Sequence, residues 1–312
     1  IPQPRSFDLL LPARDRRHSD PGFRTDSMKF IHVTDTHLVP PGDRLCALEP
    51  SARLAAIVDC MNRIDGDADF MVLTGDLSYH GGQPAYRAMK EILSNLEMPC
   101  HLLIGNHDDR ESFKRIFPET PTDGHGFVQY AVETEAGAFV MLDSVEDGHS
   151  HGVLCTDRLA WLAAQLERYR ETPVYLCLHH PPFPVGIGSL DDCMLQDPAP
   201  LGRLLKAHGD IRHIFYGHVH RPIAGSWLGI PATTLPGTNH QVGLYLGPEP
   251  EMLGSHEPPA YGICLIDDET VVVHMRNFLD ESPRFLLADP ASKTAATADD
   301  LSPLPAKLRG QA

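Results

Sequence analysis

Short apolar runs alternate with amphipathic stretches along the chain. The apolar runs are rich in Val, Ile, Leu and Phe and end at polar residues or glycines, which is typical of buried strands. The clearest amphipathic stretch covers 157–169, where Leu159, Leu162 and Leu166 share one face and Thr156 is placed to cap the helix. The expected strands are 29–34, 70–74, 101–104, 139–142, 174–178 and 213–216, and the expected helices are 52–64, 85–96, 157–169 and 201–207.

A late strand pair follows these elements. Residues 262–266 and 271–275 are apolar and are separated by four polar residues, which predicts a hairpin. The alternation of strands and helices predicts the α/β class, with sheet buried between helices. Residues 235–260 contain many Gly, Pro and His, and we expect an irregular cap or loop there. No apolar run reaches the roughly 18 residues that a membrane-spanning helix needs.

The two ends of the chain differ from its centre. Residues 1–27 are rich in Pro, Arg and Asp, and their only apolar run is too short for a signal-peptide core. Met28 opens the first strong strand, so we expect an N-terminal extension over 1–27 and a folded domain over 28–278. Residues 279–312 are rich in Pro, Ala, Ser and Asp, which predicts a C-terminal tail.

Charge and cysteine content narrow the classes of partner and compartment. The 312 residues include 42 acidic and 26 basic ones, giving a net charge of −16, which argues against a long nucleic acid as partner. A small anionic substrate remains possible because a metal ion can override the net charge locally. The seven cysteines form no CxxC pair, which indicates free thiols in a reducing compartment and hence the cytoplasm.

Polar clusters with histidine directly follow five of the apolar runs. Ligands of open α/β sheets bind beyond the carboxyl ends of the strands, so we expect these five clusters to meet at one place. The clusters are Asp35-Thr36-His37, Gly75-Asp76, Gly105-Asn106-His107-Asp108, His179-His180 and Gly217-His218-Val219-His220.

The residue types and their spacing point to a metal site. Asp35 and His37 are two residues apart, as are His218 and His220, so on extended backbone each pair faces one side. Imidazole, carboxylate and amide ligands together suit Zn, Mn, Fe or Co better than Ca or Mg. A lone DxH or HxH is a weak signal, whereas all five clusters in this order are a strong one.

The five clusters, in this order, resemble the motif blocks of the calcineurin-like metallophosphoesterase superfamily. The segments HVTDTH, GNHDD, LHHPPFPVG, IFYGHVH and TLPGTNHQV are similar to bacterial class III cyclic nucleotide phosphodiesterases and to the dinuclear-metal glycerophosphodiesterase. The similarity runs from about Met28 to Phe278. It implies a four-layer sandwich of two mixed β-sheets flanked by helices, with 28–278 as the catalytic domain, and a centre of two metal ions (Mn, Fe, Zn or Co).

The resemblance also implies roles for individual residues. His107 corresponds to a histidine that faces the substrate phosphate without binding metal, and His180 is the structural neighbour of a ligand. His240 is similar to a substrate-side histidine, although an ordinary loop histidine is an equal alternative. One metal would be held by Asp35, His37, Asp76 and His220, and the other by Asp76, Asn106, His179 and His218.

The implied activity is hydrolysis of small phosphodiesters, such as cyclic nucleotides or glycerophosphodiesters, by attack of a metal-bound hydroxide on phosphorus. A phosphomonoesterase or nucleotidase on the same centre is one alternative, and a non-catalytic scaffold is another. The acidic charge counts against a nuclease. Two departures from the relatives concern the expected pocket rim: Tyr79 stands where many have Asn or Asp, and Cys46 where many have Tyr. The resemblance also implies a homo-oligomer. No membrane partner is expected, because no apolar run is long enough to span a bilayer.

Overall fold

Two mixed β-sheets form the centre of the computed structural model, which describes residues 27–246 and 252–282. The first sheet has the order β13-β12-β1-β2-β3, and the second has the order β4-β5-β6-β7-β9-β8. The first consists of β1 (Met28–Val33), β2 (Phe70–Thr74), β3 (Cys100–Leu103), β12 (Tyr261–Ile266) and β13 (Val271–Arg276). The second consists of β4 (Tyr130–Thr134), β5 (Gly137–Leu142), β6 (Val174–Leu178), β7 (Ile211–Phe215), β8 (Ile223–Trp227) and β9 (Ile230–Thr234).

Each sheet contains a run of parallel strands, with antiparallel pairing at one edge of the first sheet and at both edges of the second. In the first sheet β1, β2 and β3 are parallel, while β12 runs antiparallel to both β1 and β13. In the second sheet β5, β6, β7 and β9 are parallel, while β4 and β8 are antiparallel. The carboxyl ends of the parallel strands therefore define one functional edge in each sheet.

The sheets pack face to face through aromatic side chains. Phe30 of β1 contacts Phe139 of β5 and Phe215 of β7 edge-on, with ring centroids 5.0 and 5.1 Å apart. Phe70 of β2 meets Phe139 in the same way at 5.1 Å. All four rings are fully buried, and such pairs each add about 0.5–1.5 kcal/mol beyond area burial. These contacts hold the two functional edges in register with each other.

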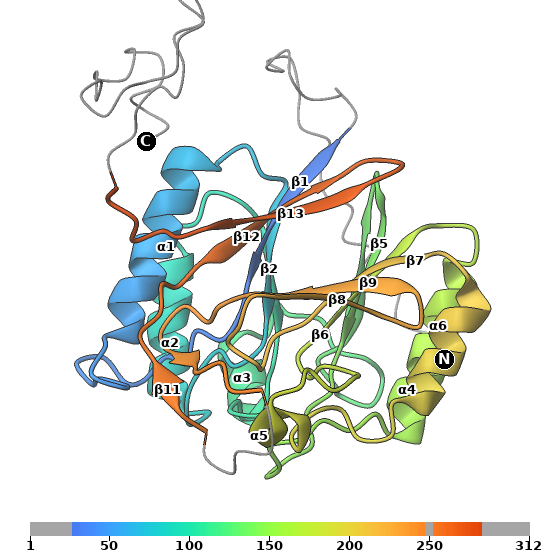
Figure 1. Cartoon of the computed structure of the whole chain (residues 1–312), viewed down its shortest axis with the longest axis horizontal. Helices are drawn as coiled ribbons and strands as arrows, with labels where there is room; N and C mark the ends of the chain where they lie inside the picture. The colour runs from blue at the N-terminus through green and yellow to red at the C-terminus, as the bar shows by residue number, and fades with distance from the viewer. Residues whose placement is uncertain (1–26, 247–251, 283–312) are drawn as a thin grey trace, which may run out of the picture.

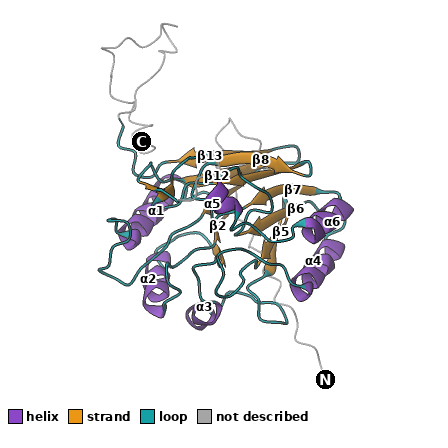
Figure 2. Ribbon diagram, turned by 60° about the horizontal axis from the view of Figure 1, so that its bottom comes forward, coloured by secondary structure: helices purple, strands orange, loops and turns teal. Residues whose placement is uncertain are grey.

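Helices cover the two outer faces, as Figures 1 and 2 show. Helices α1, α2 and α3 lie against the first sheet, and α4 and α6 against the second. The short helix α5 and the two-residue strands β10 and β11 lie in the connecting segments. The bounds are α1 Pro50–Ile64, α2 Gln83–Leu93, α3 Arg110–Ile116, α4 Thr156–Arg168, α5 Gly188–Asp191, α6 Ala199–His208, β10 Gln241–Val242 and β11 Gly254–Ser255. The predicted fold class, a sandwich of two mixed sheets flanked by helices, is confirmed.

Most predicted elements are present, with informative exceptions. All six expected strands, the late hairpin and the four expected helices form. Thr156 does not cap α4: the cap position is Cys155, and its side chain makes no capping bond. Two elements were not predicted because their hydrophobic patterns are weak. Helix α3 has Phe113 as its only buried residue, and the central residues of β8 are exposed. The described part of the predicted cap region contains β10 and β11.

Several further expectations concern termini, cysteines and membranes. The extension over 1–27 and the tail over 279–312 lie outside the described residues except for Ser27 and residues 279–282. All seven cysteines are in the described ranges, and each is a free thiol. Among the helices of the described ranges, none is long and apolar enough to cross a bilayer.

The start of α3 offers a test of local stability. The Asp109 carboxylate accepts a hydrogen bond of 2.7 Å from the Ser112 amide and thereby caps the helix. We expect Asp109→Ala to lower the free energy of unfolding by about 1 kcal/mol, because that amide loses its partner. Asp109→Asn, which keeps an oxygen acceptor, is the control and should lie close to the wild type in urea unfolding. Equal stability of the alanine variant and the wild type would contradict the capping role.

Candidate metal centre

The candidate ligands lie on loops that leave the carboxyl ends of five strands. Asp35 and His37 follow β1, Asp76 follows β2, and Asn106 follows β3 in the first sheet. In the second sheet, His179 follows β6, whereas His218 and His220 follow β7. The His218 amide donates to the Asp35 carboxylate at 3.1 Å, which ties a loop of the second sheet to a loop of the first. Within the second sheet, the Gly217 amide donates to the His179 carbonyl at 3.0 Å. Both sheets therefore contribute to one site.

A first group of side chains converges at the end of β1. His37 Nε2 lies 2.9 Å from His220 Nε2 and 3.4 Å from Asp76 Oδ2. His220 Nε2 is also 3.5 Å from Asp35 Oδ1. All four residues are buried and offer ligand atoms close enough together to hold one metal ion. Two carboxylates and two imidazoles form the mixed oxygen and nitrogen set that transition metals favour.

A second group meets the first at Asp76. His179 Nε2 is 3.4 Å from Asp76 Oδ1 and 3.2 Å from Asn106 Oδ1. The Asn106 oxygen is also 2.9 Å from His218 Nδ1. Asp76 thus directs one carboxylate oxygen at each group. A carboxylate that is shared in this way can bridge two metal ions.

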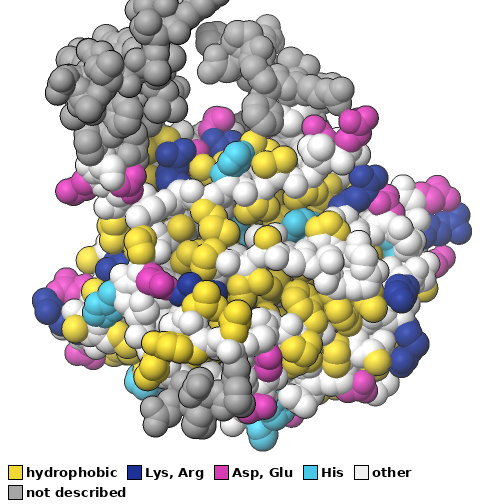
Figure 3. All heavy atoms as spheres, viewed as in Figure 1, with side chains coloured by type: hydrophobic (Ala, Val, Ile, Leu, Met, Phe, Trp, Pro, Cys, Tyr) yellow, Lys and Arg dark blue, Asp and Glu magenta, His cyan; other side chains and the backbone are white. Residues whose placement is uncertain are grey.

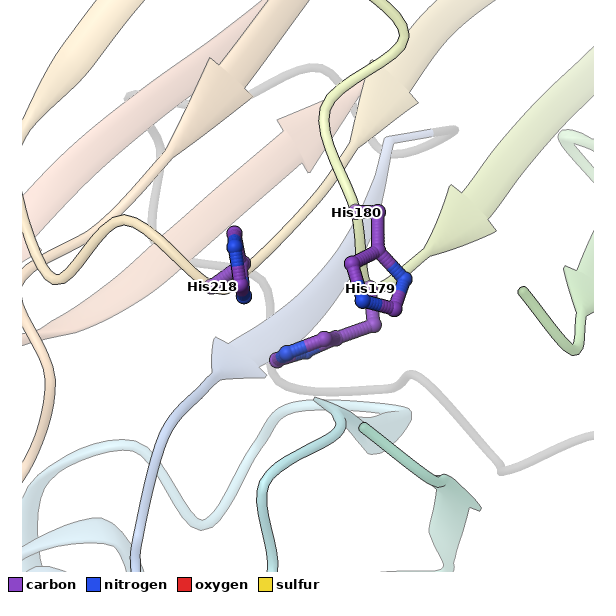
Figure 4. Close-up of side chains that lie close together, drawn as sticks. All are labelled: His179, His180 and His218. Atoms are coloured by element: carbon purple, nitrogen blue, oxygen red, sulfur yellow. The ribbon is translucent and has the colours of Figure 1, made fainter. Parts of the chain in front are cut away.

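His180 adds a third imidazole beside the second group. Its ring centroid is 4.9 Å from those of both His179 and His218, and Figure 4 shows the three rings turned toward one another. Its Nδ1 pairs with the Ser144 hydroxyl at 2.8 Å, and its ring packs on Gly152, where a Cβ would come within 2.6 Å. His180 Nδ1 is thus held by Ser144, whereas its buried Nε2 has no hydrogen-bond partner among the described residues. His179, His180 and His218 together also offer ligand atoms close enough to hold one metal ion.

Backbone carbonyls fix the tautomers of two of the histidines. His179 Nδ1 is 2.8 Å from the Thr74 carbonyl, and His220 Nδ1 is 2.9 Å from the His240 carbonyl. A carbonyl oxygen only accepts, so each Nδ1 carries a proton, and each Nε2 faces the cluster and presents a lone pair there when the ring is neutral. Histidines that bind metals in proteins are oriented by the same kind of contact. The donor set therefore fits metal ions.

The local backbone conformation is strained at the candidate ligands. Asp35, His37, Asp76, His218 and His220 have φ values of 55°, 46°, 50°, 73° and 48°, in the left-handed region. This conformation costs roughly 1–2 kcal/mol for a residue with a side chain, and it persists only where the surroundings enforce it. At Asp35 and Asp76 it turns the chain sharply at the strand end and brings the side chain into the site.

Two glycines make room for the His179 ring and the Asp76 carboxylate. Gly75 has a φ of +96°, and a Cβ there would lie 2.6 Å from His179 Nδ1. A Cβ at Gly105 would collide with Asp76 Oδ1 and lie 2.7 Å from His179 Cε1. Any side chain at either position would displace a candidate ligand.

Burial and mutual charge shift the pKa values of the cluster. Burial lowers the pKa of His37 well below its usual value and that of His218 to about 3, so both rings are neutral at pH 7. Burial alone would raise the pKa of Asp76, but His179 and His37 outweigh it and hold that pKa well below its usual range. Burial would likewise lower the pKa of His179, yet the Asp76 carboxylate raises it to about 9. The metal-free site thus contains a His179–Asp76 ion pair.

This ion pair makes metal binding dependent on pH. At neutral pH, His179 carries a proton that a metal ion must displace, because only the neutral imidazole binds metal. We expect affinity for Mn²⁺ to fall as the pH is lowered from about 9 to about 6, and binding at neutral pH to release about one proton from this residue. Titration calorimetry in buffers of different ionisation enthalpy measures that release. Binding without proton release would show that His179 is already neutral.

The two candidate catalytic histidines both lie beside the first group. The His107 ring meets the His37 ring edge-on at 4.8 Å, and the His107 amide donates to Asp76 Oδ1 at 3.0 Å. The His240 ring lies 4.8 Å from His220 and 5.3 Å from His37. Burial lowers the pKa of His240 to about 4, so it is neutral at pH 7. The structure thus brings both histidines to the cluster.

Two aspartates that support the site were not singled out in the sequence. The Asp108 carboxylate accepts from the amides of Leu77, Ser78 and Gly105 at 2.8–3.0 Å, which ties the loops after β2 and β3 together. Asp143, directly after β5, accepts from Arg110 at 2.9 and 3.1 Å and so connects α3 with the second sheet. Asp143 directly follows the apolar run of β5, and this position at a strand end could have marked it as a residue near the site.

Comparisons with known proteins agree with this geometry. A protein of Rhodopseudomonas palustris named "Probable cyclic nucleotide phosphodiesterase" is 39% identical over 265 residues, covering 84% of this chain and 97% of its own. A glycerophosphodiester phosphodiesterase of Enterobacter lignolyticus is 30% identical over 220 residues, covering 69% of this chain and 79% of its own. A dimetal phosphatase from Danio rerio shares the fold with a TM-score of 0.61 at 16% identity, covering 81% of this chain and 97% of its own.

The family model of the calcineurin-like phosphoesterases matches residues 28–222. That range begins with β1, ends just after His220, and contains all seven candidate ligands. The chain belongs to the calcineurin-like phosphoesterase family.

Proposed function

We propose that the protein is a dinuclear-metal phosphodiesterase that hydrolyses small phosphodiesters such as cyclic nucleotides or glycerophosphodiesters. The main support for this proposal is the Asp76 carboxylate, whose two oxygens face two separate ligand groups. Its Oδ2 lies 3.4 Å from His37 Nε2, and its Oδ1 lies 3.4 Å from His179 Nε2. The preference for diesters is supported by similarity to proteins named for cyclic nucleotide and glycerophosphodiester substrates. Residues 28–278 would form the catalytic domain, since β1 starts at Met28 and β13 ends at Arg276.

In this proposal the residues divide into two ligand sets. Manganese, iron, zinc or cobalt would suit both sets, because each combines imidazole nitrogen with carboxylate or amide oxygen. A bound pair of such ions supplies Lewis acidity and an activated water for attack on phosphorus. The first set is Asp35, His37, Asp76 and His220, and the second is Asp76, Asn106, His179 and His218.

His107 and His240 would act on the substrate. His107 Nδ1 donates to the Tyr79 carbonyl at 3.0 Å, so its proton-transfer atom is Nε2. We assign to Nε2 a hydrogen bond to the phosphate or proton transfer to the leaving oxygen, as general acids require. His240 also lies beside the first group, 5.3 Å from His37, and would contact the substrate through its neutral ring.

A substrate comparison tests the diester assignment. With protein reconstituted in manganese, we expect kcat/KM for bis(p-nitrophenyl) phosphate to exceed that for p-nitrophenyl phosphate by about tenfold or more. The metal-free protein is the control. A preference for the monoester would replace the diester assignment with a phosphatase or nucleotidase. Failure to hydrolyse either ester with two metal equivalents bound would favour the scaffold.

Location and assembly complete the proposal. Seven free cysteines fit a reducing compartment, and we place the protein in the cytoplasm. We propose a homo-oligomer because edge strand β13 exposes Val272 and Met275, at 42 and 44%. Figure 3, in the same view as Figure 1, shows many hydrophobic side chains on the face where β13 lies. Light scattering tests this assembly, and a monomer at micromolar concentration would contradict it.

A further inference from the structure

Tyr79 contacts the ring of His107 face to face. The two ring centroids are 4.9 Å apart, and the planes are inclined by only 21°. Tyr79 also meets His37 edge-on at 5.7 Å. The tyrosine therefore touches both a candidate ligand and the candidate catalytic histidine.

The His107 ring needs a contact of this kind to be held in one orientation. Its side chain has one hydrogen bond, from Nδ1 to the Tyr79 carbonyl at 3.0 Å. A single bond at one ring atom still permits the ring to tilt about that atom. The Tyr79 ring on its face and the His37 ring beside it at 4.8 Å restrict that tilt. Together these contacts fix where Nε2 points.

The backbone of Tyr79 is itself firmly anchored. Its amide donates to the Leu38 carbonyl at 2.9 Å, and the preceding Ser78 pairs with Leu38 in a β-bridge. The Ser78 amide is held by the Asp108 carboxylate at 3.0 Å, and the Ser78 hydroxyl accepts from the Gly81 amide at 2.7 Å. Tyr79 thus presents both its carbonyl and its ring from a fixed position.

We propose that Tyr79 is a positioning residue for His107, which it orients by its backbone carbonyl and by stacking of its ring. This inference rests on the proposed phosphodiesterase function. Within the described ranges the Tyr79 hydroxyl makes no hydrogen bond, so the ring carries the effect. An Asn or Asp at this position would keep the carbonyl but lose the stacking.

Two substitutions at Tyr79 separate ring from hydroxyl. Tyr79→Phe keeps the ring, and we expect its kcat to stay within about twofold of the wild type, since one aromatic face replaces another. Tyr79→Leu removes the ring, and we expect kcat to fall about three- to tenfold, in line with the loss of one aromatic pair. KM and metal content should not change in either variant. His125→Ala, at an exposed position before β4 that does not contact Tyr79, is the control.

A change of leaving group distinguishes positioning of His107 from a merely structural role, because a structural role would lower kcat equally for both esters. Phenoxide is a poorer leaving group than p-nitrophenoxide and depends more on the histidine that assists its departure. The loss in Tyr79→Leu should therefore be larger for diphenyl phosphate than for bis(p-nitrophenyl) phosphate. An equal loss for both esters, a raised KM with unchanged kcat, or equal damage by Tyr79→Phe would overturn the positioning role.

A second readout is independent of turnover. Crystal structures of the zinc-loaded proteins show the orientation of the His107 ring directly. We expect one ring orientation in the wild type and in Tyr79→Phe, and in Tyr79→Leu a ring that is tilted about its Nδ1 hydrogen bond or spread over more than one orientation. A single, unchanged orientation in all three proteins would refute the proposal. A wild type that bound metal but hydrolysed neither ester would refute the proposed function instead.

Discussion

Replacement of Asp76 by alanine is expected to abolish diester hydrolysis, with kcat/KM falling by about 10⁴-fold or more, or about 5.5 kcal/mol of transition-state stabilisation. The physical reason is that one carboxylate serves both ligand groups, with Oδ2 at 3.4 Å from His37 and Oδ1 at 3.4 Å from His179. The variant also loses the acceptor of the His107 amide. Metal analysis should show fewer than two equivalents bound, together with the loss of turnover.

The Asp76 experiment has two informative companions. Asp76→Asn keeps the shape of the side chain but replaces one ligand oxygen by an amide nitrogen that has no lone pair to offer, so it should fail almost as completely. Asp59→Ala removes an exposed aspartate from helix α1 and should behave as wild type. Full activity of a metal-depleted Asp76→Ala protein would contradict the proposed centre altogether.

Replacement of His107 by alanine is expected to lower kcat by about 10²- to 10⁴-fold, the usual contribution of a general acid or base. His107 lies outside both ligand groups, so the variant should still bind two equivalents of metal. A combined measurement of kcat and metal content therefore distinguishes this variant from Asp76→Ala. An unchanged kcat would remove His107 from the mechanism, and lost metal would indicate that its ring supports His37.

The parallel strands and their polar ends could be predicted because each is a local pattern. The strand before Asp76 is a run of five buried residues, and the glycine after it marks the turn. In contrast, α3 has only Phe113 on its buried face, which is too little periodicity to reveal a seven-residue helix. Likewise, β8 has an exposed Ala-Gly-Ser centre and forms because it pairs with β9, a contact that no local pattern encodes.

The chemistry of the candidate ligands was predictable, whereas their orientation was not. Sequence spacing groups His218 with His220, but it does not show that one uses Nδ1 toward Asn106 and the other Nε2 toward Asp35. Those choices depend on carbonyls from distant segments, such as Thr74, which is 105 residues from His179. The stacking of Tyr79 on His107 depends equally on the way two loops pass each other.

The position of the ligands at the ends of both sheets has a consequence for biosynthesis. His218 lies 183 residues after Asp35, and each proposed ligand set contains a residue that follows β7. A nascent chain on the ribosome therefore has neither complete ligand set until β7 has been translated and has docked into the second sheet. Metal acquisition is thereby a late event of maturation, and it reports that both halves of the sandwich have come together.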